Sequence, residues 1–207
     1  MRVSQILKVS SRLVVVTLWM KLIAIFLMLA AATLSPATAS GSGSTKMLFD
    51  FRNSGNSSGW SAVNDGVMGG LSKGGSRSTG NALKFAGTLS LENNGGFSSI
   101  RKNTNRNLSA YKGIRLRVKG DGRTYQLRMQ TNSRYRSWPV AYSGDFRTKN
   151  GNWTEVTIPF KSMKQGFRGR KLKDYPFDPA KIELVGLVIG DKKAGPFALE
   201  VEWIQAY

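Results

Sequence analysis

The sequence predicts an all-β protein, a sandwich of two packed sheets with about nine strands, behind an N-terminal signal segment. Apolar and polar residues alternate with a period of two in most segments after residue 46, as in strands with one buried face. No amphipathic helix of ten or more residues is found by pattern. The length of 207 residues suits one domain. Strands of this kind must pack as two sheets or close into a barrel, and their uneven lengths favour a sandwich.

The expected strands follow from the apolar pattern of each segment. They lie at 46–51, 83–91, 97–102, 114–119, 125–130, 138–142, 153–158, 182–189 and 197–203. The segment 182–189 is almost entirely apolar, as expected of a strand buried on both faces. Pro159 ends the strand before it, because proline cannot donate a hydrogen bond within a sheet. Helical turns are expected only at 160–163 and 178–181.

Two neighbouring segments predict a β-hairpin. In 114–119 and in 125–130, every second residue is apolar, and the residues between them are basic or polar. The Gly-Asp-Gly-Arg sequence at 120–123 is typical of a tight turn. We therefore expect these two strands to pair.

The N-terminus has the features of a secretory signal. Residues 22–34 are apolar except for one threonine, and small residues lead up to Ala39. This order predicts export and cleavage between Ala39 and Ser40, with Met20 as an alternative start. The alternatives are an uncleaved membrane anchor at 13–34 and an organelle transit peptide. The only charged residues before the cleavage site are Arg2, Lys8, Arg12 and Lys21.

The expected organisation is a signal peptide at 1–39, a flexible linker at 40–46 and a folded domain at 47–207. Without the signal, the chain has 27 basic and 12 acidic residues, a net charge of +15. A periplasmic or extracellular protein with this charge is attracted to anionic membrane surfaces, acidic polymers such as polysaccharides, and acidic proteins. Nucleic acid is not expected as a partner outside the cytoplasm.

The composition excludes several classes of enzyme. The chain has no cysteine and no histidine, which excludes Cys/His zinc sites, thiol nucleophiles and Ser-His-Asp triads. Carboxylates remain as acid–base groups, and Glu200 and Glu202 share one strand face, but no carboxylate lies in a catalytic motif. No Asp-rich calcium loop is present either. We expect a protein that is not an enzyme and has no metal or cofactor.

The segment from Trp60 to Ser72 carries the most specific pattern, W-S-A-V-N-D-G-V-M-G-G-L-S. Asn64 and Asp65 can bond to downstream backbone amides, and glycines allow a positive φ or a close backbone approach. The pattern predicts a tight turn that leads into a strand, with Val67 or Met68 pointing inward.

This pattern resembles the signature of the complex I intermediate-associated protein family. Further resemblances are at 95–101, 111–114, 120–122, 153–160 and 182–190, so the resemblance covers about residues 47–207. It implies a galactose-binding-like jelly-roll β-sandwich, and a role like that of the mitochondrial members, which are assembly factors for NADH:ubiquinone oxidoreductase. The candidate binding residues from these blocks are Trp60, Asn64, Asp65, Gly66, Met68, Gly69, Gly70, Ser72 and Arg101.

A second candidate site is the aromatic and basic segment 134–142. Tyr135, Trp138 and Tyr142 could stack on a sugar, and the neighbouring arginines could contact anions. The alternative is that the aromatic residues at 138 and 142 are inward residues of a strand, with the arginines in solvent.

Two basic surfaces are candidates for contact with anions. The first is a basic loop at 161–173, represented by Lys164, Arg168, Arg170 and Lys171. The second is the face of the expected hairpin, with Arg115, Arg117 and Lys119 on one strand and Arg128 on the other. Like charges across a sheet repel one another, so an anionic partner is expected unless solvent separates them.

The favoured function is non-catalytic binding or assembly outside the cytoplasm, with a protein partner such as a subunit of a membrane complex. A carbohydrate-binding protein that recognises a sugar or an anionic polymer is the main alternative. A carboxylate-based hydrolase would need two acids close together in a cleft.

Overall fold

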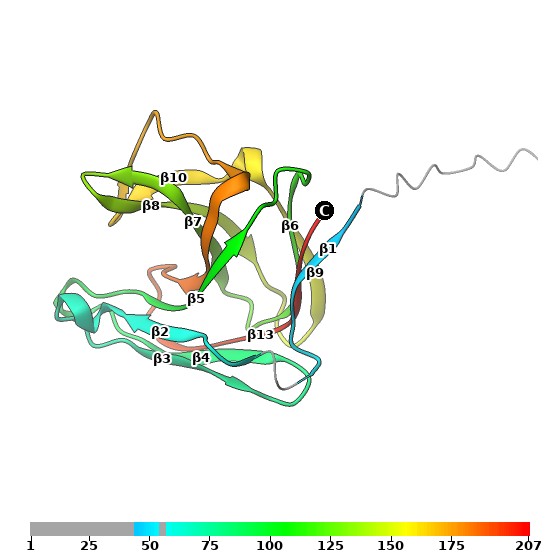
Figure 1. The fold of residues 1–207 in the computed structure, drawn as a ribbon. Coiled ribbons are helices and arrows are strands. Elements are labelled where there is room, and N and C mark those ends of the chain that lie inside the picture. The colour runs from blue at the N-terminus through cyan, green and yellow to red at the C-terminus, as the bar shows by residue number, and fades with distance from the viewer. Residues whose placement is uncertain (1–43, 54–56) are drawn as a thin grey trace, which may run out of the picture. The chain divides into compact units, whose positions relative to one another are not determined.

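In a computed structural model, residues 44–53 and 57–207 form two antiparallel sheets that pack as a sandwich (Figure 1). The expected signal segment, the cleavage site at Ala39 and Ser40, and most of the linker lie outside these described residues. Within the described part of the chain, no helix is both long and apolar enough to cross a membrane. The predicted all-β jelly-roll sandwich is confirmed.

The first sheet has six strands: five follow the order β3-β4-β13-β6-β9, and the sixth, β1, pairs with β13 beside this path. Strand β13 is long enough to pair with β4 along its first half and with β1 along its second half. The bounds are β1 Lys46–Asp50, β3 Lys73–Ser78, β4 Leu83–Leu89, β6 Gly113–Lys119, β9 Trp153–Pro159 and β13 Gly195–Ala206.

The second sheet has seven strands in the order β11-β10-β8-β7-β12-β5-β2. Its bounds are β2 Ser61–Asn64, β5 Ser98–Arg106, β7 Thr124–Tyr135, β8 Trp138–Arg147, β10 Lys164–Phe167, β11 Arg170–Lys171 and β12 Ile182–Ile189. Within the described residues, 3-10 turns that join strands include η2 Asp65–Met68, η3 Glu92–Asn94, η4 Phe160–Ser162 and η5 Pro179–Lys181. The last two lie where helical turns were expected.

The core lies between the inner faces of the two sheets. Leu116 and Val118 of β6 are buried on one side, and Leu127 and Met129 of β7 are buried on the other. The residues between them on each strand face outward, as the period of two predicts.

The predicted hairpin is wrong. Strand β6 pairs with β13 and β9, whereas β7 pairs with β8 and β12 in the other sheet. The turn at 120–123 instead carries the chain from one sheet to the other, and Arg123 anchors it through an ion pair with Asp191 at 2.6 Å. An alternating pattern determines which residues face the core, but the partner strand depends on the whole topology.

The strand expected after the turn of the 60–72 motif is β3, which begins at Lys73. The structure also contains strands that the pattern did not predict. These are β2, β10 and β11, of which β2 and β11 lie at sheet edges. Edge strands are often short and polar, which weakens their apolar pattern. The expected basic loop at 161–173 is therefore in large part a β-hairpin, formed by β10 and β11.

Candidate functional site

The Asp65 carboxylate holds together the two sequence blocks at 60–72 and 95–101. It has no exposed surface. One oxygen accepts the backbone N–H of Ser72 at 2.9 Å. The other accepts the Ser72 hydroxyl at 2.5 Å and the N–H groups of Gly96 and Phe97 at 2.6 and 3.2 Å. Asp65 therefore fixes the turn after β2 against the loop before β5.

These contacts determine the charge state of Asp65. Burial alone would raise the pKa of the carboxyl group, because it disfavours the charged form. The hydrogen bonds from Ser72, Gly96 and Phe97 outweigh burial and hold the pKa of Asp65 below its usual value. The group is thus an ionised structural clamp with its acceptor sites occupied by the protein.

Two glycines of the motifs leave room for this carboxylate. A Cβ atom at Gly70 would lie 2.4 Å from the Asp65 Cγ atom, and one at Gly95 would lie 2.6 Å from an Asp65 oxygen. Gly69 instead has a positive φ of 87° and ends η2, in open space. Gly66 is also in open space.

Other motif residues also have structural roles. The Asn64 side chain links the two sheets: it accepts the Ser98 hydroxyl at 2.6 Å and donates to the Gly74 carbonyl at 3.1 Å. Trp60 is buried and packs edge-on against Phe49, with ring centroids 5.3 Å apart. These contacts leave Asn64 and Trp60 little scope to bind a partner.

The same turn displays apolar side chains to solvent. Val67 is 73% exposed and Met68 is 60% exposed, so the prediction that one of them points inward is wrong. The interior of the turn is occupied by the Asp65 carboxylate, which leaves only the outward direction. Leu71 and Leu91 are exposed as well.

We call Val67, Met68, Leu71 and Leu91 the motif patch. The turn that carries Leu91 lies beside η2, because the Asn93 amide donates to the Gly69 carbonyl at 3.2 Å. In Figure 1, the short helix after β2 lies at the left edge of the molecule, next to the loop that leads into β5. Sequence reasoning did not identify Leu71 and Leu91 as exposed, because leucine is usually buried and no local pattern marks these two as exceptions.

The aromatic candidates form a second cluster, at the tips of two hairpins. Tyr135 lies 5.5 Å from Phe167 and 6.0 Å from Tyr175 between ring centroids, and Trp138 is 55% exposed beside Phe167. The Arg168 guanidinium lies 5.1 Å from the Trp138 ring. Phe167 and Tyr175 were not singled out from the sequence, because they are distant along the chain.

Tyr142 does not belong to this surface. It is buried, its hydroxyl donates to the Pro176 carbonyl at 3.1 Å, and its ring packs against Phe177. The two alternatives for segment 138–142 therefore each hold for one residue: Tyr142 is an inward strand residue, and Trp138 is accessible to a ligand.

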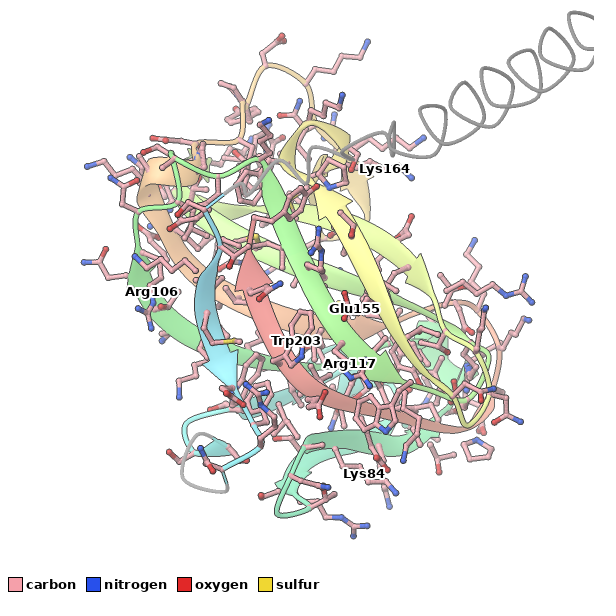
Figure 2. All side chains as sticks on the ribbon, turned by 90° about the vertical axis from the view of Figure 1, so that its right-hand side faces the viewer. Lys84, Arg106, Arg117, Glu155, Lys164 and Trp203 are labelled. Atoms are coloured by element: carbon pink, nitrogen blue, oxygen red, sulfur yellow. The ribbon has the colours of Figure 1, made fainter. Side chains whose placement is uncertain are left out.

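The basic face expected to need an anionic partner is largely compensated within the protein. Arg117 pairs with Glu202 at 2.6 Å and with Glu155 at 3.9 Å, and Figure 2 shows Arg117 and Glu155 on adjacent strands. Lys119 pairs with Glu200 at 2.8 Å. Glu200 and Glu202 are therefore ion-pair partners of basic side chains.

The remaining basic candidates are distributed over different surfaces. The Arg115 guanidinium lies 5.2 Å from the Tyr207 ring, and Lys164 reaches Asp145 at 3.2 Å. Arg170 and Lys171 are exposed on β11. Arg128 is on the seven-stranded sheet, so the prediction that it faces Arg115 and its neighbours is wrong. It lies instead near Arg101 of β5.

Among the described residues, no group of three or more His, Cys, Asp or Glu side chains is placed to hold a metal ion. A pocket of about 780 Å³ lies at the end of the sandwich near η4. The side chains that line it are aromatic, apolar or basic, and none is acidic: Tyr111, Lys112, Pro159, Phe160, Lys161, Met163, Phe177, Pro179 and Tyr207.

Known proteins match both the sequence and the fold. The family model described as Complex I intermediate-associated protein 30 (CIA30) matches residues 49–201. The mitochondrial complex I intermediate-associated protein 30 of Mus musculus is 32% identical over 103 residues, which cover 48% of this chain and 31% of that protein. A probable counterpart in Caenorhabditis elegans is 30% identical over 95 residues, covering 44% and 28%. The matched region thus spans about a third or less of these relatives.

Solved structures share the fold at low sequence identity. The family 11 carbohydrate-binding module of the cellulase Lic26A-Cel5E of Clostridium thermocellum has a TM-score of 0.62 and 16% identity, covering 79% of this chain and 94% of that chain. The agarase AgWH50C has a TM-score of 0.55 and 12% identity, covering 78% and 24%.

Proposed function

The chain belongs to the complex I intermediate-associated protein 30 family, and from this membership we propose that it is a non-catalytic docking protein that holds a subunit of a membrane complex during assembly. The relatives are named as intermediate-associated proteins, which supports a protein partner. The absence of histidine and cysteine from the sequence agrees with a role in binding.

The motif patch is the observation that carries this proposal. Large apolar side chains are normally buried, and a group of them in solvent marks a surface that another molecule covers. Here the buried Asp65 carboxylate holds the turn that displays them. A surface fixed before binding loses less conformational entropy on association, so it suits a docking role.

We further propose that the protein acts outside the cytoplasm, in the periplasm or extracellular space. The basic and apolar N-terminal segment that ends at Ala39 supports export. The excess of basic residues would favour an acidic partner or an anionic membrane surface near that partner. The complex it serves would then expose a surface on the outer side of the membrane.

Substitutions in the motif patch test the docking role. We expect Met68→Ser combined with Leu71→Ser to leave thermal stability nearly unchanged, because both side chains are exposed. Co-purification of the partner from the native envelope should fall at least about 30-fold, as for loss of a binding hot spot. Met47 is also an exposed methionine, on β1, so Met47→Ser is the matched control and should retain the partner.

The exposed Trp138 favours carbohydrate binding as a second candidate function. One solved neighbour of similar fold is a family 11 carbohydrate-binding module in complex with a β-1,3-1,4-mixed-linked tetrasaccharide. Trp138, Tyr135 and Phe167 could offer ring faces to a sugar.

Affinity electrophoresis in gels that contain mixed-linked β-glucan tests whether the protein binds carbohydrate. A carbohydrate-binding protein would be retarded, and Trp138→Ala would restore its mobility because the exposed ring is lost. Equal mobility with and without the glucan would reject binding of this polymer by the aromatic cluster.

A further inference from the structure

Two arginines lie side by side on the outer face of the seven-stranded sheet. In the strand register, Arg128 of β7 and Arg101 of β5 are both opposite Gly186 of β12, which runs between them. Glycine has no side chain, so nothing from β12 separates the two arginines at this row. A Cβ atom at position 186 would lie 3.4 Å from the Arg101 Cγ atom, so the Arg101 side chain crosses over Gly186.

Neutral groups provide the hydrogen-bond acceptors for both guanidinium groups. Arg101 Nε donates to the Ser99 hydroxyl at 3.2 Å. Arg128 donates from Nε to the Ser143 hydroxyl at 3.4 Å and from Nη2 to the Gln126 side chain at 3.2 Å. Among the residues that the structure describes, no carboxylate forms an ion pair with either arginine.

Other arginines of the protein differ in this respect. Arg117, Arg123 and Arg134 each contact a carboxylate at 2.6 to 2.7 Å. Neither arginine of the pair on the seven-stranded sheet contacts a carboxylate directly, although acids neutralise arginine elsewhere. The nearby acid, Asp145 on β8, accepts from Gln126 at 2.7 Å.

The environment of this pair disfavours its charge. Burial, together with the smaller effect of the positive charge of Arg101, lowers the pKa of Arg128 to about 10. Burial also lowers the pKa of Arg101. Partly buried charges of the same sign are costly unless an anion compensates them.

We propose that Arg101 and Arg128 form a binding site for a doubly charged oxyanion, a phosphate or sulfate group. Two guanidinium groups offer several N–H donors in planar arrays, which match the oxygens of such a group. A dianion neutralises both charges, whereas a single carboxylate neutralises one. The Ser143 hydroxyl lines the same site and can orient its proton toward the ligand. The Ser99 hydroxyl and the Gln126 amide nitrogen already donate to the Val63 carbonyl and to Asp145, both at 2.7 Å. The group can come from free phosphate or from a phosphate ester.

The test measures the thermal stability of the mature protein in phosphate-free buffer with added inorganic phosphate, glucose 6-phosphate or glucose. Sodium chloride at matched ionic strength controls for screening. Binding to the folded state raises the midpoint temperature, by about 3 °C or more when the ligand is tenfold above its dissociation constant. Stabilisation by inorganic phosphate alone identifies the free ion as the ligand. Stabilisation by inorganic phosphate and by glucose 6-phosphate, but not by glucose, identifies the phosphate group as the part that binds. A response to glucose 6-phosphate alone assigns the ester.

Variants locate the site. Arg101→Gln should weaken phosphate binding at least about tenfold, because charge-assisted hydrogen bonds are lost. Arg101→Lys keeps the charge without the planar group and should bind more weakly than the natural protein. Arg115→Gln, on the outer face of the other sheet, is the matched control and should bind normally. No stabilisation beyond that of sodium chloride, or an equal loss in Arg101→Gln and Arg115→Gln, would overturn the proposal.

Discussion

Replacing Asp65 by Ala is expected to lower the free energy of unfolding by about 3–5 kcal/mol, near the upper end for single substitutions. The carboxylate accepts four hydrogen bonds in a fully buried position. Its loss leaves the N–H groups of Ser72, Gly96 and Phe97 without their partner and opens a cavity between two loops. Urea unfolding of the natural and variant proteins measures the difference.

One further variant separates the charge of Asp65 from its size, and another serves as a control at an exposed carboxylate. Asp65→Asn has nearly the same shape, but its amide nitrogen must face at least one N–H donor, so we expect a large loss as well. Asp145→Ala removes an exposed carboxylate and should change stability by less than about 0.5 kcal/mol. A loss below about 1 kcal/mol in Asp65→Ala would contradict the role of this carboxylate as a clamp.

Replacing Gly70 by Ala is expected to cost about 3 kcal/mol, although alanine is the smallest possible side-chain addition. The new Cβ atom would lie 2.4 Å from the Asp65 Cγ atom. The carboxylate cannot move away without breaking its hydrogen bonds. Gly95→Ala should have a similar effect, because its Cβ atom would lie 2.6 Å from an Asp65 oxygen and 2.9 Å from the Glu92 carbonyl.

Neighbouring glycines of the same motif supply the controls. Gly69→Ala should cost about 1 kcal/mol from its positive φ alone, since no atom lies within 4 Å of the added carbon. Gly66→Ala meets neither obstacle and should be close to neutral. Thermal unfolding of the four variants should give this order, and equal stability of Gly70→Ala and Gly66→Ala would show that the Asp65 pocket tolerates an added carbon.

The fold class could be predicted from the sequence because a strand with one buried face has a local alternation of apolar and polar residues. Residues 114–119 and 125–130 are correct as strands, yet their pairing is not, because a turn such as 120–123 can join two sheets as readily as it joins a hairpin. Strand β3, with the sequence KGGSRS, is held by β4 through its backbone and has no apolar pattern to detect.

The candidate site was predictable only in part. Asp65 was identified as a turn residue from its immediate neighbours, but its contacts with Gly96 and Phe97 come from more than 30 residues away. Apolar residues such as Met68 were expected inside, since burial is their usual state. Their exposure results from the buried carboxylate, which no local rule anticipates.

Site-directed photo-crosslinking from position 68 tests most directly whether the motif patch is the docking surface. A photoreactive residue in place of Met68 should yield one discrete adduct with another protein of the native cells, identifiable by mass spectrometry. The same residue in place of Met47 should yield none. Adding Asp65→Ala to the first variant should abolish the adduct, because the turn would no longer be held in place. No adduct from position 68, or the same adduct from position 47, would contradict the docking role of the patch.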